Sequence, residues 1–327
     1  MTINLKFGAL SLALVTTSAY ASFAVVGANG GDGDAWEQYV AADAFNQSVR
    51  LDMGNSYGSG GLFSRETFTF QGEEYIKLCF ATADHVVRNK TLNDITFAGA
   101  SAPVTLSPAG WFTQVHLGGY DGNDDLAFVG MRAKRSDLSA ATLTFLDNLA
   151  PLALATPDTS DVTNYGFGTS ANYTRDGNND IDGFFWRPNF EDFAVSRGYT
   201  NHRWVNSDVT AVENFAYSIY NFEAIKWNVS NATTFGGINQ GDSGGVIRQN
   251  GKFVGVNSFN QYVEGSDLQG LYRIYQLGSQ QGGNAFTQDN IDWLGDHCAE
   301  LEAVPEPGTI AALVGLSLAA AAKRRKR

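Results

Sequence analysis

The sequence predicts a mostly β fold, built either as a sandwich or as barrels. The 327 residues include 36 glycines and are 13% aromatic. Short apolar runs alternate with clusters of Gly, Asn and Asp, which is typical of many short strands joined by turns. Long stretches with helical periodicity are scarce. Composition alone does not decide between a sandwich and a pair of barrels.

Residues 1–21 are predicted to be a signal peptide and are set apart from the fold. The segment has one lysine, Lys6, then an apolar run from Phe7 to Val15. Ala19-Tyr20-Ala21 has the form after which signal peptidase cuts, and a cut after Ala24 is an alternative. A buried N-terminal helix is the competing interpretation, but the apolar run is short and opens the chain. We therefore expect export across the inner membrane.

The C-terminal end has three parts in order. Pro305-Glu306-Pro307 precedes an apolar run that ends at Ala322, and a basic tail, Lys323 to Arg327, follows. The run is shorter than the roughly 20 residues that span a bilayer, and the cations favour the cytoplasmic side. This order resembles the PEP-CTERM sorting signal of Gram-negative bacteria. The resemblance implies that residues 301–327 anchor the chain transiently in the membrane until an exosortase-type enzyme cleaves them. A plain anchor is the alternative.

The segment between these ends, residues 22–300, is long enough for one large core or two fused small barrels. It is more acidic than the whole chain, whose net charge is −12, because six of the cations lie in the two signals. Such a surface repels nucleic acid and anionic membranes, so nucleic acid is not expected as a partner. Two cysteines in an exported protein favour one disulfide over two free buried thiols.

Several elements are predicted along this segment. Asp289 to His297 favours a closing helix, with Ile291 and Leu294 on one face. Short strands are expected at Thr67–Phe70, Tyr75–Phe80, Leu126–Val129 and Phe253–Val256.

Three short segments carry side chains suited to nucleophilic catalysis. Gly241–Val246 places a serine among glycines, where the backbone turns tightly and aims its N–H groups at one point. Cys79–Val87 is an apolar strand ending in small residues and His85, a base that activates a serine hydroxyl. Asn123–Val129 is an acidic turn that leads into an apolar strand. Taken singly, each is equally well a glycine turn, a turn histidine or a solvated acidic loop.

Together, in the order His, Asp, Ser, the segments resemble the trypsin/chymotrypsin family of serine peptidases. Thr82–His85 matches the family's Thr-Ala-Ala-His with Asp84 in place of an alanine. Asp125–Ala127 matches Asp-Ile-Ala, and Gly241–Gly245 matches the nucleophile loop without change. The long spacing from Asp125 to Ser243 implies insertions in the second barrel. Further similarities occur at Ser59–Phe63, Tyr165–Gly168, Gly255–Phe259 and Asp292–Leu294.

This resemblance implies two six-stranded antiparallel β-barrels with a C-terminal helix, and a serine endopeptidase acting on proteins or peptides without a required cofactor. Ser243 would attack the carbonyl, His85 would move the proton, and Asp125 would orient His85. Asp124 is the rival acid, but Asp125 abuts the apolar strand. The backbone N–H groups of Gly241 and Ser243 would form the oxyanion hole.

The resemblance also implies residues for substrate binding, activation and cross-linking. Gly237 falls at the base of the specificity pocket, which argues against cleavage after Lys or Arg and favours apolar or small side chains. Asp242 would receive the ammonium of a new N-terminus, with Val25 as the candidate, although Val25 is equally well a first strand. Substrate would lie along Ser258, Phe259 and Asn260, and a disulfide would join Cys79 to Cys298.

One acidic motif and two competing functions stay open. Oxygen-bearing side chains alternate in a manner suited to Ca²⁺, but a solvated acidic turn is the more ordinary interpretation. The candidate ligands are Asp176, Asn178, Asp180 and Asp182. A catalytically silent relative that binds proteins is the main alternative to a peptidase, and a structural matrix protein is the third. Location at the surface, in an extracellular matrix or in the medium is equally compatible.

Overall fold

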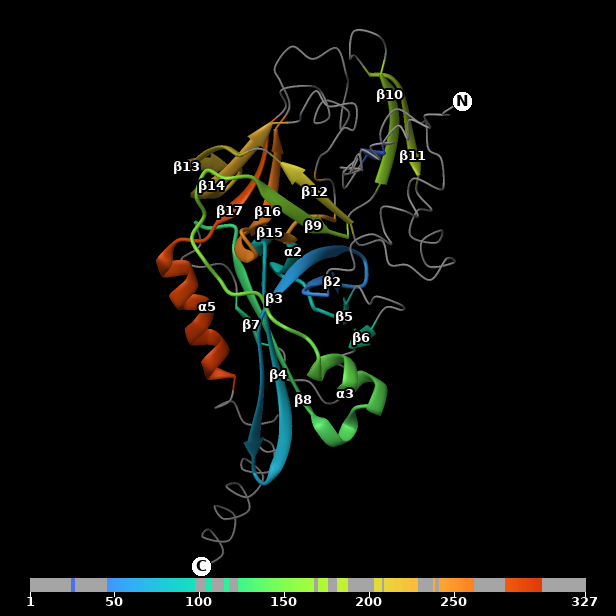
Figure 1. Ribbon diagram of the computed structural model, residues 1–327, viewed down its shortest axis with the longest axis vertical. Coiled ribbons are helices and arrows are strands. Elements are labelled where there is room, and N and C mark those ends of the chain that lie inside the picture. The colour runs from blue at the N-terminus through green and yellow to red at the C-terminus, as the bar shows by residue number, and fades with distance from the viewer. Residues whose placement is uncertain are drawn as a thin grey trace, which may run out of the picture.

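The computed structural model describes residues 25–26, 46–97, 104–106, 115–117, 123–167, 170–175, 181–187, 203–207, 209–228, 238, 241–261 and 280–301. These residues form two seven-stranded sheets, a small three-stranded sheet and a long C-terminal helix (Figure 1). The mostly β class and the closing helix are therefore confirmed.

The first sheet holds the N-terminal half of the described chain. β4 lies in its interior, paired with β3 and β8, and eight consecutive residues of β4 are buried. The strands in spatial order are β6 (Val104–Leu106), β5 (Asp94–Phe97), β2 (Ser48–Asp52), β3 (Tyr57–Phe70), β4 (Glu73–Thr82), β8 (Ala127–Lys134) and β7 (Val115–Leu117). The short helix α2 (Asp84–Val87) follows β4, while η1 (Arg135–Asp137) and α3 (Ala140–Asp147) follow β8.

The second sheet holds the C-terminal half. Its strands in spatial order are β12 (Arg203–Ser207), β9 (Val162–Gly166), β15 (Val246–Gln249), β16 (Lys252–Gln261), β17 (Gln280–Ala285), β14 (Tyr220–Asn228) and β13 (Val209–Tyr217). A third sheet orders β1 (Val25–Val26), β10 (Ser170–Arg175) and β11 (Ile181–Arg187), with β1 parallel to β10.

The expected architecture of two antiparallel β units with a C-terminal helix is confirmed, but each sheet has seven described strands and neither closes into a barrel. A barrel closes when its first and last strands pair. Within the described strands, β6 and β7 share no pairing in the first sheet, and neither do β12 and β13 in the second. The β13–β14 hairpin lies between Asp125 and Ser243 in the chain, and β13 is an edge strand of the second sheet.

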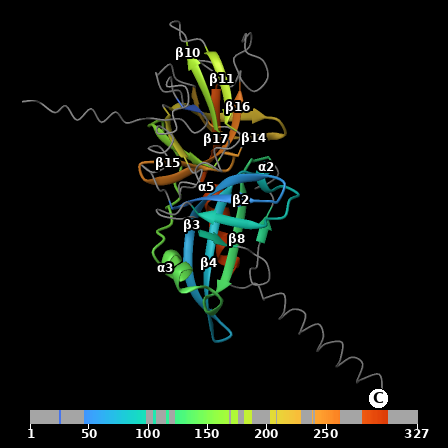
Figure 2. The same ribbon diagram turned by 90° about the vertical axis from the view of Figure 1, so that its right-hand side faces the viewer.

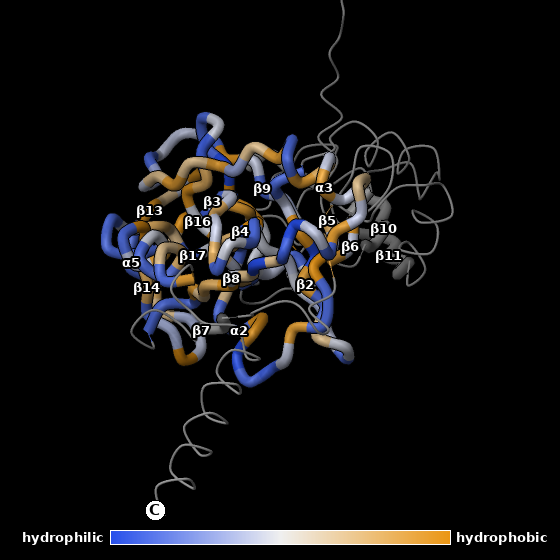
Figure 3. The backbone as a smooth tube through the Cα atoms, turned by 90° about the horizontal axis from the view of Figure 1, so that it is seen from below, coloured by the Kyte–Doolittle hydropathy of each residue, from blue (hydrophilic) through white to orange (hydrophobic). Residues whose placement is uncertain are grey.

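The two sheets share one apolar core. Leu62 of the first sheet and Val246 and Phe253 of the second belong to a single buried cluster. At Gly61 an added Cβ would lie only 2.4 Å from Val246 Cγ2 and 2.5 Å from Phe253 Cε1, so glycine allows this close approach. Figure 2 shows the strands of the first sheet below those of the second, and Figure 3 shows hydrophobic stretches along the strands.

Helix α5 (Gln288–Glu300) packs against the first sheet and ends the described chain. Thr287 and Asn290 form a capping box at its N-terminus, which satisfies two backbone N–H groups. Leu294 is fully buried, and a disulfide joins Cys298 to Cys79 on β4. The pairing of the two cysteines is as expected.

The described residues contain no helix with the length and apolar character needed to cross a membrane. The predicted transient anchor, like most of the two end segments, lies outside these residues.

Candidate active site

The His85 and Asp125 side chains meet where β4 ends and β8 begins. Thr82 pairs with Ala127 in the antiparallel β4–β8 ladder, which brings together the residues that follow β4 and those that precede β8. His85 Nδ1 lies 2.7 Å from Asp125 Oδ2, and the His85 backbone N–H donates to Asp125 Oδ1 at 3.0 Å. Both carboxylate oxygens therefore hold His85, one through the ring and one through the backbone.

The two partners differ in exposure. The His85 side chain is 37% exposed, whereas that of Asp125 is 1% exposed. A buried carboxylate needs hydrogen-bond donors to offset its lost hydration. Ser258, on β16 of the second sheet, supplies a further donor through its hydroxyl to Asp125 Oδ2. The sequence assigned Ser258 to substrate binding, which stays a prediction, and its hydroxyl contacts the Asp125 carboxylate.

Asp124, the rival acid, has a different partner. Asn290 of helix α5 donates through Nδ2 to Asp124 Oδ2 at 2.8 Å. The carboxylate that contacts His85 is that of Asp125.

Ser243 lies in a turn formed by residues 241–244, which we call the nucleophile loop. Gly241 and Gly244 have φ angles of +94° and +79°, a region that glycine adopts without the strain of a side chain. The loop is held at its backbone: Ser59 N–H donates to the Ser243 carbonyl at 2.8 Å, and Ser59 Oγ donates to the Gly241 carbonyl at 2.8 Å. Ser243 itself is partly exposed.

The nucleophile loop packs on the residues that directly precede His85. A Cβ added to Gly244 would lie 2.1 Å from Thr82 Oγ1 and 2.9 Å from the Ala83 nitrogen. Only a glycine fits there, and the contact brings the segments that carry Ser243 and His85 together. A hydroxyl, an imidazole and a buried carboxylate on such adjoining segments suit activation of a serine nucleophile.

Asp242, the predicted activation partner, is fully buried. Its carboxylate faces β9, because a Cβ added to Gly166 would lie 2.4 Å from Asp242 Oδ1. Val25 lies in β1, where it pairs with Ala171 of β10.

The predicted substrate-binding residues lie on and near β16. Phe259 is buried and stacks on Phe215, with 4.4 Å between ring centroids. Asn260 donates through Nδ2 to the Ile238 carbonyl at 3.0 Å, and Gln281 Oε1 accepts from Ile238 N–H at 3.0 Å. Gly237, the residue before Ile238, lies outside the described residues.

The Ca²⁺ candidate also falls largely outside them. Asp176, Asn178 and Asp180 are not described, and Asp182 is described only as a position on β11. Within the described part of the chain, no three His, Cys, Asp or Glu side chains are grouped as a metal would require.

Sequence reasoning missed Tyr220 and Arg88. Tyr220 donates its hydroxyl to Asp84 Oδ2 at 2.9 Å, and Arg88 Nε donates to the same oxygen. Burial raises the pKa of Tyr220, and the charges of Asp125 and Asp84 raise it further, so the hydroxyl keeps its proton. The one available signal was Asp84 itself, an acid where the resembled family has alanine.

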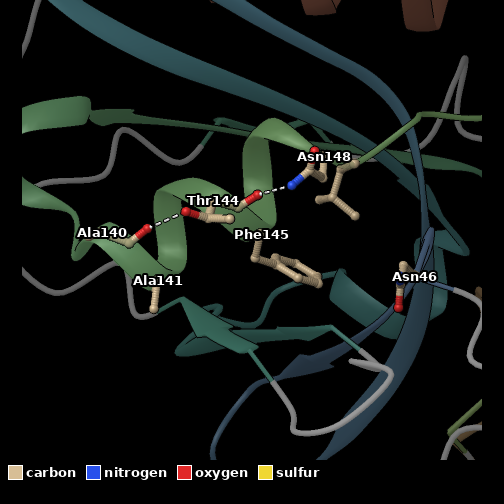
Figure 4. Close-up of a pocket in the computed structure, with 7 residues that line it drawn as sticks. Asn46, Ala140, Ala141, Thr144, Phe145 and Asn148 are labelled. Atoms are coloured by element: carbon tan, nitrogen blue, oxygen red, sulfur yellow. Dashed lines mark hydrogen bonds between the residues drawn. The ribbon is translucent and has the colours of Figure 1, made fainter.

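A pocket beside α3 is separate from these residues. It is lined by Asn46, by α3 residues that include Thr144 and Phe145, and by Asn148, the residue that caps the C-terminal end of α3 (Figure 4). Thr144 Oγ1 donates to the Ala140 carbonyl, and Asn148 Nδ2 donates to the Thr144 carbonyl, so these polar groups are used within the helix. None of its lining residues is a predicted site residue.

Comparison with known families identifies the C-terminal end. Residues 303–327 match the family model for the PEP-CTERM protein-sorting motif. The chain therefore ends in that sorting motif, which marks exported proteins of Gram-negative bacteria. No curated protein sequence matches the chain.

Several solved structures are similar to the chain. An inactive form of Rv3671c from M. tuberculosis H37Rv has 15% identity over 86% of this chain and 100% of that chain, with a TM-score of 0.42. A Glu endopeptidase has 13% identity over 78% and 91% of the two chains, with a TM-score of 0.44. A mutant of human heparin binding protein (CAP37) has 18% identity over 80% and 93%, with a TM-score of 0.43.

Proposed function

We propose that the chain is an exported serine endopeptidase with His85, Asp125 and Ser243 as its catalytic triad. One observation carries the proposal. The buried Asp125 carboxylate holds both the ring and the backbone of His85, and the Ser243 segment packs on the residues just before His85. Burial gives the carboxylate a fixed orientation, which a solvated acidic loop would lack.

The proposed reaction uses groups of the chain alone. Ser243 Oγ attacks the scissile carbonyl while His85 Nε2 takes its proton, and Asp125 keeps the Nδ1–H tautomer and stabilises the imidazolium. The N–H groups of Gly241 and Ser243 hold the oxyanion. His85 returns the proton to the leaving amine, and water then hydrolyses the acyl-enzyme. No cofactor takes part, and we expect EDTA to leave the reaction unchanged; a loss of activity would favour the Ca²⁺ candidate.

A fluorophosphonate probe tests this function. We expect the secreted protein to be labelled on Ser243, and Ser243→Ala to abolish labelling. Asp125→Asn should slow labelling by on the order of 10⁴-fold, because the imidazole loses its tautomer. Ser136→Ala, which changes an exposed serine, is the matched control. A folded protein that is not labelled would contradict a peptidase and favour the silent protein-binding alternative.

We further propose that the primary pocket accepts apolar or small side chains. Ile238, which is 3% exposed, follows Gly237, and Asn260 and Gln281 fix its backbone. Because Gly237 carries no carboxylate to pair with Lys or Arg, cleavage of a peptide library should follow apolar or small residues. Preferential cleavage after Lys or Arg would contradict this assignment.

Activation and sorting belong to the same proposal. A cut after Ala24 would give Val25 an ammonium group, and Asp242 is a buried carboxylate that such a group would pair with. N-terminal sequencing of the active protein should then begin at Val25. A fully active protein that begins at Ser22 would contradict this step.

An exosortase-type enzyme would recognise the C-terminal motif.

A further inference from the structure

The turn end of the β13–β14 hairpin contacts both loops that carry the proposed triad residues of the first sheet. Tyr220 Oη donates to Asp84 Oδ2 at 2.9 Å, and Asp84 directly precedes His85. The next residue, Asn221, donates its N–H to the Asn123 carbonyl at 2.8 Å, two positions before Asp125. Consecutive residues of one strand in the second sheet therefore bond to two loops of the first.

Asp84 is a fully buried carboxylate. Its Oδ2 accepts from Arg88 Nε, four residues along the chain, as well as from Tyr220. The Arg88 guanidinium carbon lies 5.2 Å from the centroid of the Tyr220 ring. Burial of a charge is costly unless donors surround it, so these contacts fix Asp84 and with it the start of α2.

Tyr220 is itself fixed by the second sheet. It is 7% exposed and packs in a cluster with Phe222, Ala224 and Phe259. Its backbone pairs with Tyr217 at the end of the β13–β14 ladder. The hydroxyl therefore stands at a fixed place relative to β16, the strand on which Ser258 contacts Asp125.

This link matters because the proposed triad is divided between the sheets. His85 and Asp125 belong to the first sheet, whereas the nucleophile loop runs into β15 of the second. Proton transfer needs roughly 2.6–3.2 Å between the base and the hydroxyl. A misplacement of about 1 Å costs on the order of 100-fold in rate.

We propose that Tyr220 is a positioning residue. Through its hydrogen bond to Asp84, it keeps the His85 imidazole within reach of the Ser243 hydroxyl. Its catalytic consequence rests on the proposed peptidase function. The bond needs an acceptor at position 84, where the resembled family has alanine, so this device belongs to the present chain.

The first test measures phosphonylation by the fluorophosphonate probe in Tyr220→Phe. This change removes the hydroxyl and keeps the ring in its cluster. We expect the limiting rate at saturating probe to fall roughly 10-fold or more, with the half-saturating concentration unchanged. Tyr75→Phe, the same change near the far end of β4, is the control and should keep the wild-type rate. An unchanged limiting rate in Tyr220→Phe would overturn the proposal.

The second test is independent of activity. The chain has four histidines, so the ring ¹⁵N signals of His85 can be assigned with a single His85→Gln variant. Tyr220→Phe should shift or broaden these signals, whereas Tyr75→Phe should not. A protein that the probe does not label, yet whose His85 signals respond to Tyr220→Phe, loses the peptidase function and keeps the positioning role. A normally labelled protein with unaltered His85 signals in Tyr220→Phe loses the positioning role.

Asp84→Ala removes the acceptor of the same bond and carries both tests if Tyr220→Phe does not fold. In the double variant the limiting rate should fall no further than in Asp84→Ala alone, because the bond that Tyr220→Phe removes is already lost. Fully multiplicative effects would show that Tyr220 acts by another route.

Discussion

The Asp125 side chain is only 1% exposed, and its carboxylate makes three contacts, two with His85 and one with Ser258. His85 donates through its backbone N–H and faces the carboxylate with Nδ1, and Ser258 donates from the second sheet. An unpaired charge at such a place would shift toward its neutral form or destabilise the fold. The hydroxyl of Ser258 therefore contributes to both stability and the orientation of His85.

Ser258→Ala should reveal this contribution. Loss of a hydrogen bond to a buried charge is expected to lower the free energy of unfolding by about 1.5–3 kcal/mol. Labelling by the probe should slow as well. Ser160→Ala, which removes an exposed serine that also bonds a carboxylate, should change stability by less than about 0.5 kcal/mol. Urea unfolding that gives equal stabilities for the two variants would contradict this account of Ser258.

The sequence predicted which segments carry the candidate site residues, but it did not predict the hydrogen bonds that join these segments to distant residues. His85, Asp125 and Ser243 were found because each stands in a short pattern. The bond of Ser258 to Asp125 spans 133 residues and that of Tyr220 to Asp84 spans 136. Such contacts follow from how two sheets dock, which no local pattern records.

Helix α5 is fastened to the first sheet at both ends. At its start, Asn290 closes the capping box and bonds to Asp124, next to the proposed acid. Near its end, Cys298 is cross-linked to β4, and Arg132 donates to the Leu301 carbonyl at 3.2 Å. The helix therefore ties the end of the described chain to the loop that carries Asp125.

Removal of the disulfide tests how much the fold depends on this attachment. The Cys79→Ala, Cys298→Ala double variant should lose about 2–5 kcal/mol of unfolding free energy, because a long loop is no longer closed in the unfolded chain. Urea unfolding measures the loss. As a control, the unfolded and unreduced wild type should take up no iodoacetamide. Alkylation of both thiols in that control would show that the bridge is absent.

The strands were predicted where apolar and β-branched residues dominate. For one of them, the predicted range is shorter than the strand in the structure. From composition only Thr67–Phe70 was expected as a strand, and Ser59–Phe63 was expected as one only through the family resemblance; both lie in β3, which begins at Tyr57. The added part includes Ser59-Gly60-Gly61, and glycines ordinarily predict a turn or a bulge. Gly61 is needed here because β3 passes close to the Val246 and Phe253 side chains of the second sheet. That reason is tertiary and could not be read from the segment alone.

At the scale of the whole molecule, the approach of the two sheets determines the site. Gly61 stands where β3 meets Val246 and Phe253, and Gly244 stands where the nucleophile loop meets Thr82. Since these contacts bring residues of separate sheets together, a wider separation would draw the Ser243 segment away from His85.

Two glycine substitutions test this close approach. Gly61→Ala should destabilise the protein by about 1–3 kcal/mol, because the added methyl overlaps the side chains of the second sheet. Gly295→Ala is the matched control: nothing lies within 4 Å of its added Cβ, and alanine favours the helix by about 1 kcal/mol. Thermal unfolding should therefore shift in opposite directions. A Gly61→Ala variant as stable as the wild type would contradict the tight contact between the sheets.

A crystal structure of the protein after reaction with the fluorophosphonate tests the central claim most directly. We expect the phosphorus to be bonded to Ser243 Oγ, with His85 Nε2 within about 3.2 Å of that oxygen. A phosphonyl oxygen should face the N–H groups of Gly241 and Ser243 at about 2.7–3.1 Å. Phosphorus on another residue, or an imidazole well outside hydrogen-bonding reach of Ser243, would contradict a catalytic site at this junction of the sheets.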